Sequence, residues 1–127
     1  MRKRKTVLLV EDDQFSRFMM KEVIDMLGVD VDIAENGKQG CQTLDENPDK
    51  YGLVLMDLHM PEMSGIDAAR YIRAKVPPNP VPIIAVTADV EYHDDRVVER
   101  LGMNGFAAKP VSPGQLMDLI DEYCHLH

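Results

Sequence analysis

Four short, uninterrupted apolar segments recur along this chain, and they constrain its fold more than any other feature. They are TVLLV at 6–10, LVLM at 53–56, IIAV at 83–86 and GFAA at 105–108. Apolar runs of this length are typical of strands buried on both faces, as in a parallel sheet covered by helices. A fifth segment, VDVDI at 29–33, alternates apolar with acidic residues, which is typical of an edge strand with one wetter face. Together they predict a five-stranded parallel sheet.

Stretches between and after these segments carry apolar or small residues at helical spacing. We expect these residues to form the buried faces of five helices: Phe15, Met19, Val23 and Met26 or Leu27; Gly37, Gly40, Cys41 and Leu44; Ile66, Ala69 and Ile72; Val97, Val98 and Leu101; and Leu116, Leu119, Ile120 and Tyr123. Ser64 and Ser112 stand where N-caps are expected, and Pro113 follows Ser112 at the first helical position. Strand and helix therefore alternate along the chain.

Five β-α units with right-handed crossovers predict an α/β fold, a three-layer α/β/α sandwich. The edge character of 29–33 predicts the strand order 2-1-3-4-5, which is the flavodoxin-like arrangement. We expect a single domain over residues 1–127. In open sheets of this kind, sites form at the carboxyl ends of the strands, beside the switch point between the first and third strands.

Charge and composition exclude several classes of protein. The chain has 14 basic and 22 acidic residues, a net charge of −8, which argues against direct nucleic-acid binding. The basic run RKRK at 2–5 is interpreted as a solvated N-terminal overhang. No apolar run approaches the ~20 residues of a membrane span, and Cys41 and Cys124 lack metal-binding spacing. We therefore expect a soluble protein with buried thiols in a reducing cytoplasm.

Polar residues follow four of the predicted strands. The first strand ends in the acids at 11–13, the third in Asp57, the fourth in Thr87 and the fifth in Lys109. Carboxylates in one cleft raise one another's pKa unless a cation lies among them, and an all-oxygen ligand set fits Mg²⁺. A carboxylate can also act as a nucleophile and form an aspartyl phosphate, whose oxygens a lysine would neutralise.

These segments resemble the receiver domain of two-component response regulators, the CheY-like superfamily, over about residues 5–125. The resemblance rests on LLVEDD at 8–13, VLMDLHMPEMSG at 54–65, IIAVTA at 83–88 and GFAAKP at 105–110. The sequence of the segment MDLHMPEMSG is also similar to that of receivers attached to hybrid histidine kinases. A receiver is a signalling domain that catalyses only its own phosphorylation and dephosphorylation.

The resemblance implies a role for each acid of the site. Asp57 is the expected phosphoacceptor. Asp12 and Asp13 are the expected acidic pair that organises Mg²⁺, with Asp13 as the direct ligand, and the backbone carbonyl of His59 is a further ligand. An alternative for Asp13 is that it only caps the first helix. His59 and Asp89 occupy positions that are expected to tune dephosphorylation.

The resemblance also implies a switch. Thr87 is the expected switch hydroxyl, Lys109 is the phosphate-neutralising lysine, and the Lys109–Pro110 bond is expected to be cis. Phe106 occupies the aromatic switch position, where a phenylalanine rotates without a phenol hydroxyl. Its alternative role is that of an ordinary core aromatic.

The implied function is a phosphorelay switch. A histidine kinase or a histidine phosphotransfer domain supplies the phosphoryl group, and the altered surface is read by an effector that the sequence does not identify. We expect a monomer or a weak homodimer. Phe15, Phe18 and Met19 on the first helix are a candidate docking face for the phosphodonor protein, with core packing as the competing interpretation, because spacing alone does not tell which side is buried.

Three other functions remain as alternatives. An aspartyl phosphohydrolase of the haloacid-dehalogenase type needs a second Asp two residues after the nucleophile, and His59 stands there instead. A flavodoxin-like FMN-binding protein needs a Ser/Thr/Gly-rich phosphate loop, whereas EDDQFS at 11–16 is acidic. A degenerate receiver would bind partners without phosphorylation, which the intact set of site residues disfavours.

Overall fold

The predicted strands all form and pair in parallel in the order β2-β1-β3-β4-β5. The computed structural model describes residues 5–124, so most of the RKRK segment at 2–5 lies outside the described residues. The strands are β1 (Thr6–Val10), β2 (Val31–Ala34), β3 (Tyr51–Asp57), β4 (Ile83–Thr87) and β5 (Gly105–Ala108). The predicted fold class and strand order are therefore confirmed.

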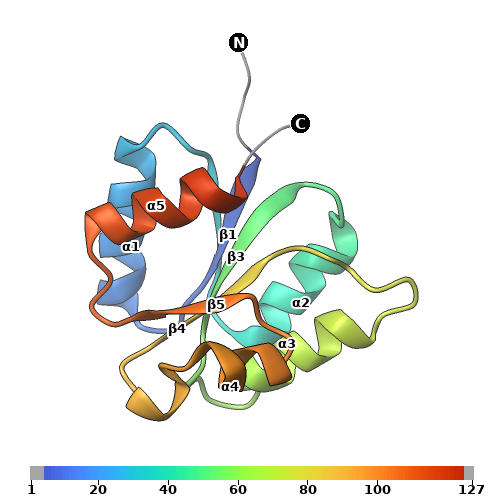
Figure 1. Cartoon of the computed structure of the whole chain (residues 1–127). Helices are drawn as coiled ribbons and strands as arrows, with labels where there is room; N and C mark the ends of the chain where they lie inside the picture. The colour runs from blue at the N-terminus through green and yellow to red at the C-terminus, as the bar shows by residue number, and fades with distance from the viewer. Residues whose placement is uncertain (1–4, 125–127) are drawn as a thin grey trace.

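Helices cover both faces of the sheet (Figure 1). They are α1 (Gln14–Met26), α2 (Gly37–Glu46), α3 (Gly65–Ala74), α4 (Asp95–Arg100) and α5 (Pro113–Tyr123), with a short 3₁₀ helix, η1 (Val90–Tyr92), before α4. Helices α1 and α5 lie together on one face, and α2, α3 and α4 lie on the other (Figure 1). The result is the expected three-layer sandwich.

Alternate residues of each central strand supply the two cores. In β1, Val7 and Leu9 pack with residues of α1 and α5, whereas Leu8 and Val10 pack with residues of α2 and α3. Every residue of β3 is buried, as expected for the middle of a sheet covered on both faces. Both thiols are buried in these cores, as predicted. No helix within residues 5–124 is both long and apolar enough to cross a membrane.

Two helices begin where their capping residues predict. The Ser64 hydroxyl accepts a hydrogen bond from the backbone N–H of Asp67 (3.1 Å), and the Ser112 hydroxyl accepts one from that of Gln115 (3.1 Å). Pro113 occupies the first position of α5, where its missing N–H costs nothing. Each cap satisfies a backbone donor that has no partner inside its helix.

The predicted buried face of α1 is only partly confirmed: Val23 and Leu27 are half-buried and pack against the core, whereas the other predicted residues do not. Phe15, Met19 and Met26 are 70%, 48% and 83% exposed, and the buried residues of the helix are Met20 and Ile24. Apolar side chains lie on opposite sides of this helix, so residue spacing fits two faces equally well. Packing against the sheet and α5 selects one of them and leaves the other apolar face in solvent.

Candidate functional site

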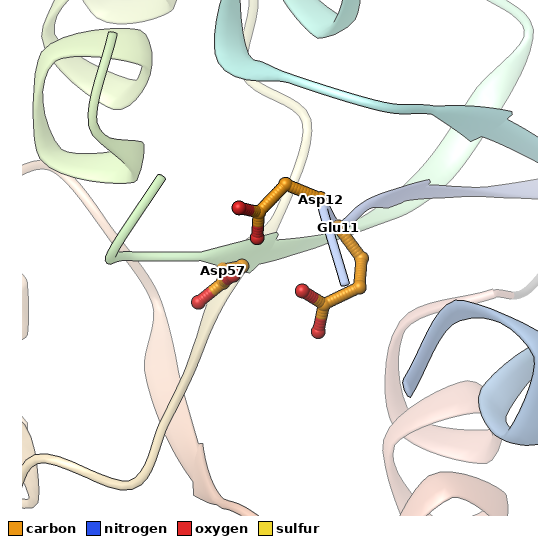
Figure 2. A group of neighbouring side chains, drawn as sticks. All are labelled: Glu11, Asp12 and Asp57. Atoms are coloured by element: carbon orange, nitrogen blue, oxygen red, sulfur yellow. The ribbon is translucent and has the colours of Figure 1, made fainter. Parts of the chain in front are cut away.

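Strand register brings the acids of β1 and β3 together. Val10 pairs with Met56, so the next residues, Glu11 and Asp57, lie side by side where the two strands end. One carboxylate oxygen from each of Glu11, Asp12 and Asp57 lies within 4.8 Å of the other two, and the three side chains converge (Figure 2). Glu11 and Asp57 are buried, and Asp12 is exposed.

Lys109 supplies the positive charge closest to these acids. It follows β5, and its Nζ lies 2.6 Å from Glu11 Oε1 and 3.6 Å from Asp57 Oδ2. Burial lowers the pKa of Lys109, but the hydrogen bond to Glu11 and the charge of Asp57 outweigh burial, so the net pKa is raised. The lysine therefore stays protonated beside the two buried carboxylates. The peptide bond that follows it, Lys109–Pro110, is cis, as the resemblance implied.

One lysine does not neutralise three acids. Burial, followed by the hydrogen bond and charge of Glu11 and a contact with Asp12, raises the pKa of Asp57 to about 8, against the opposing pull of Lys109. A cation bound beside this buried carboxyl and its acidic neighbours would favour its charged form. Three clustered carboxylates are oxygen donors of the kind that Mg²⁺ prefers, so the residues present fit this ion.

Asp13 has a different position from the one expected of a direct metal ligand. Its Oδ2 accepts a hydrogen bond from the Ser16 backbone N–H (2.8 Å), which caps α1 and holds the pKa of Asp13 below its usual range. The clustered carboxylates instead include Glu11, which the sequence analysis did not assign to the metal site. The Glu11 backbone N–H still bonds to Ala34 O (3.1 Å) as a continuation of the β1–β2 pairing. The first acid after the strand is therefore the one that is buried.

Thr87 lies at the end of β4 and is buried. Its hydroxyl accepts a hydrogen bond from the Asp89 backbone N–H (3.0 Å), and its carbonyl accepts one from the Lys109 backbone N–H (3.0 Å). The hydroxyl that was predicted to switch is thus engaged with the loop after β4 in this structure.

Phe106 is half-buried and stacks on a residue that the sequence analysis did not single out. The rings of Phe106 and His93 are nearly parallel, with centroids 5.3 Å apart and an interplanar angle of 13°. His93 Nε2 also lies 2.8 Å from the Thr87 carbonyl oxygen. The imidazole therefore links the two residues expected to form the switch. No local sequence pattern signals this contact, because the stacking partners come from different elements.

The loop after β3 frames Asp57. The His59 backbone N–H donates to Asp57 Oδ1 (3.3 Å), and its exposed ring places Nε2 3.1 Å from Asp89 Oδ2. Glu62 has a left-handed backbone (φ 68°), unusual for a residue other than glycine. Gly65 packs so tightly that a Cβ there would collide with the Asp57 carbonyl oxygen. The loop therefore needs glycine at position 65.

The chain is similar in sequence and fold to known proteins. The family model of the response regulator receiver domain matches residues 7–121. The peroxide stress-activated histidine kinase mak3 of Schizosaccharomyces pombe is 32% identical over 121 residues, which cover 92% of this chain. The chain spans only 5% of the length of mak3.

Two solved structures are similar over nearly their whole length. The receiver domain of the sensor histidine kinase PA1611 from Pseudomonas aeruginosa, with a magnesium ion coordinated in its active-site cleft, is 31% identical (TM-score 0.82; 94% of this chain and 96% of that one covered). The receiver domain of the response regulator Ssk1 of Saccharomyces cerevisiae, in complex with the phosphotransfer protein Ypd1, gives a match 28% identical (TM-score 0.83; 98% and 91% covered).

Proposed function

The chain belongs to the response regulator receiver domain family, and from that premise we propose that it is a phosphoacceptor switch whose acceptor is Asp57. The observation that carries the proposal is the buried Asp57 carboxylate at the meeting point of Glu11, Asp12 and Lys109. A buried acid with this high a pKa destabilises the fold, and strongly perturbed acids of this kind are typical of functional sites.

The proposed reaction is phosphoryl transfer from a phosphohistidine. An oxygen of the Asp57 carboxylate attacks the phosphorus, the new O–P bond forms as the P–N bond breaks, and the histidine imidazole leaves with the electron pair of that bond. Lys109, already 3.6 Å from Asp57 Oδ2, pairs with the phosphoryl oxygens that arrive there. The donor is a histidine kinase or a histidine phosphotransfer protein.

The metal proposal follows from the same acids. Glu11, Asp12 and Asp57 would hold Mg²⁺, with the His59 carbonyl as a further ligand, and the magnesium in the PA1611 receiver supports this choice of ion. When bound, Mg²⁺ supplies positive charge to the phosphoryl oxygens. For Asp13 we favour the role of a helix cap over that of a direct ligand, since its carboxylate is occupied by Ser16.

The proposed output is a rearrangement of Thr87 and Phe106. Thr87 leaves Asp89, turns toward the new phosphoryl group and vacates space for Phe106, which changes the surface that a partner reads. A Thr87→Ala variant should accept phosphate at a rate close to that of the wild type and should bind the partner equally with and without phosphate. Equal phosphate-dependent binding by wild type and variant would contradict the switch role.

The surface for the phosphodonor protein is proposed to be the exposed apolar face of α1. Phe15 and Met19 line a groove of about 360 Å³ together with Pro110 and Val111 of the loop after β5, and Phe18 is exposed nearby on the same helix. The groove also contains Lys109, so a protein bound there would lie beside the site. The complex of Ypd1 with the Ssk1 receiver supports this kind of partner.

The test is intact-mass spectrometry after incubation with acetyl phosphate, with Mg²⁺ or with EDTA. We expect a gain of one phosphoryl group that requires Mg²⁺ and is lost in Asp57→Asn. Asp118→Asn, a change of an exposed α5 carboxylate, is the matched control and should gain the group normally. Failure of the wild type to gain the group under any condition would instead favour a binding module that works without phosphorylation.

A further inference from the structure

A second cation, Arg17, lies against the backbone that carries the acids of the site. Its NH1 donates hydrogen bonds to the carbonyl oxygens of Glu11 (3.2 Å) and Asp12 (3.4 Å). Its NH2 lies 3.5 Å from Glu35 Oε1 in the loop after β2. The Arg17 side chain is 17% exposed, whereas that of Glu35 is 62% exposed. Because exposed ion pairs contribute little, the two carbonyl contacts are the main interactions of this guanidinium.

These contacts fix the loop from which two of the three clustered carboxylates project. Glu11 and Asp12 both precede α1, whereas Arg17 belongs to the helix itself. The guanidinium therefore ties the acidic loop back onto α1 and, through Glu35, to the loop after β2. The orientation of each peptide unit sets the direction of the side chain beside it, so holding both carbonyls limits where the carboxylates can point.

The two cations near the site have different partners. Lys109 contacts carboxylate oxygens of Glu11 and Asp57 directly. The contacts of Arg17 in this loop are with main-chain oxygens, which leaves the Asp12 carboxylate for a metal ion. Groups that orient metal ligands from outside the coordination sphere typically change metal affinity by about 10- to 100-fold when they are removed.

We infer that Arg17 is a positioning residue for the metal site, and that it holds Glu11 and Asp12 in the arrangement that binds Mg²⁺. The inference rests on the proposed function, since it assumes that these carboxylates bind the ion. It makes a prediction opposite in sign to that of simple electrostatics. Removing a positive charge near the acids should strengthen Mg²⁺ binding, because less charge repels the ion. Losing the hydrogen bonds from Arg17 to the Glu11 and Asp12 carbonyls should instead weaken Mg²⁺ binding.

The test is isothermal titration of the full chain with MgCl₂, for wild type, Arg17→Gln and Arg17→Lys. We expect about tenfold weaker Mg²⁺ binding in Arg17→Gln. Arg17→Lys keeps the charge, but a lysine lacks the planar set of donors that contacts two carbonyls and Glu35 together. Its Mg²⁺ affinity should therefore lie between those of Arg17→Gln and the wild type. Acetyl phosphate kinetics should show a higher Mg²⁺ concentration at half-maximal rate and a maximal rate close to that of the wild type.

Lys21→Gln is the matched control. It removes the same charge one turn along α1, where the Lys21 Nζ pairs with Asp25 (2.7 Å) and not with the acidic loop. We expect its Mg²⁺ affinity to stay within about twofold of the wild type or to rise slightly. Glu35→Gln, which keeps both carbonyl contacts, should behave similarly.

The outcomes separate the inference from the proposed function. Unchanged or tighter Mg²⁺ binding in both Arg17 variants, with normal binding by the wild type, would overturn the inference alone. A lower melting temperature in EDTA for Arg17→Gln with unchanged Mg²⁺ affinity would reduce Arg17 to a purely structural residue. A wild-type protein that binds no Mg²⁺ would overturn the inference and the proposed metal site together.

Discussion

The raised pKa of Asp57 makes the stability of the metal-free protein depend on pH in an unusual direction. The ordinary value for this carboxyl is 3.8, and in the folded protein it is about 8. Between these values the folded protein holds a proton that the unfolded chain has released. The unfolded state therefore binds fewer protons, so the free energy of unfolding falls as the pH rises from about 4 to 8.

The size of this effect follows from the span of about four pKa units, since each unit corresponds to about 1.36 kcal/mol. The full cost of ionising Asp57 is then about 5 kcal/mol at pH 8 and above, and nearly nothing at pH 4. Asp57→Asn removes the ionisation and keeps a side chain of the same size. The variant should be more stable than the wild type by several kcal/mol at pH 8, and the difference should vanish toward pH 4.

Urea unfolding in EDTA between pH 4 and 8.5, followed by circular dichroism, measures this difference directly. Titrating groups far from Asp57 contribute equally to both proteins and cancel, so the difference reports Asp57 together with the neighbouring groups that interact with it. Asp118→Asn on the exposed side of α5 should show a flat difference across the same range. Mg²⁺ should reduce the difference at pH 8, since it binds the folded wild type and stabilises it. A difference between Asp57→Asn and the wild type that does not change with pH would refute the reasoning.

Three further predictions test the loops around the site. Gly65→Ala would make a Cβ collide with the carbonyl oxygen of Asp57, the proposed phosphoacceptor, so we expect a loss of about 3 kcal/mol in urea unfolding and slower phosphorylation by acetyl phosphate. Arg73→Met removes three hydrogen bonds to the loops before β4 and β5 and should lower the free energy of unfolding by about 2–4 kcal/mol without changing Mg²⁺ affinity. His59→Ala and Asp89→Ala each break the 3.1 Å contact between the His59 ring and the Asp89 carboxylate. Both should change the decay rate of the phosphorylated protein more than its Mg²⁺ affinity. Unchanged decay in both variants would exclude a role of this pair in dephosphorylation.

The strands and their order could be predicted because the signals for them are local. Unbroken apolar runs mark strands covered on both faces, and the alternation in 29–33 marks an edge. From the strand order alone, the acids after β1 and β3 must meet. The polar residues at four strand ends could therefore be assigned to one edge of the sheet by sequence alone.

The structure departs from or adds to the sequence predictions where the outcome depends on tertiary packing. The α1 sequence places Met19 and Met20 on different sides of the helix, and only the sheet and α5 decide that Met20 is buried. Three consecutive acids likewise look equivalent in sequence. The β1–β2 pairing continues through Glu11 and buries it, and the start of α1 takes Asp13 as its cap. The stacking of His93 on Phe106 joins two elements and has no counterpart in local spacing.

Glu11 and Asp57 both attract Lys109, so the two carboxylates compete for the same positive charge. At 2.6 Å, Glu11 holds the lysine more closely than Asp57 does at 3.6 Å. In the proposed reaction, a phosphoryl group on Asp57 would compete with Glu11 for Lys109. We therefore expect the close Glu11 contact to oppose any movement of Lys109 toward a group attached to Asp57.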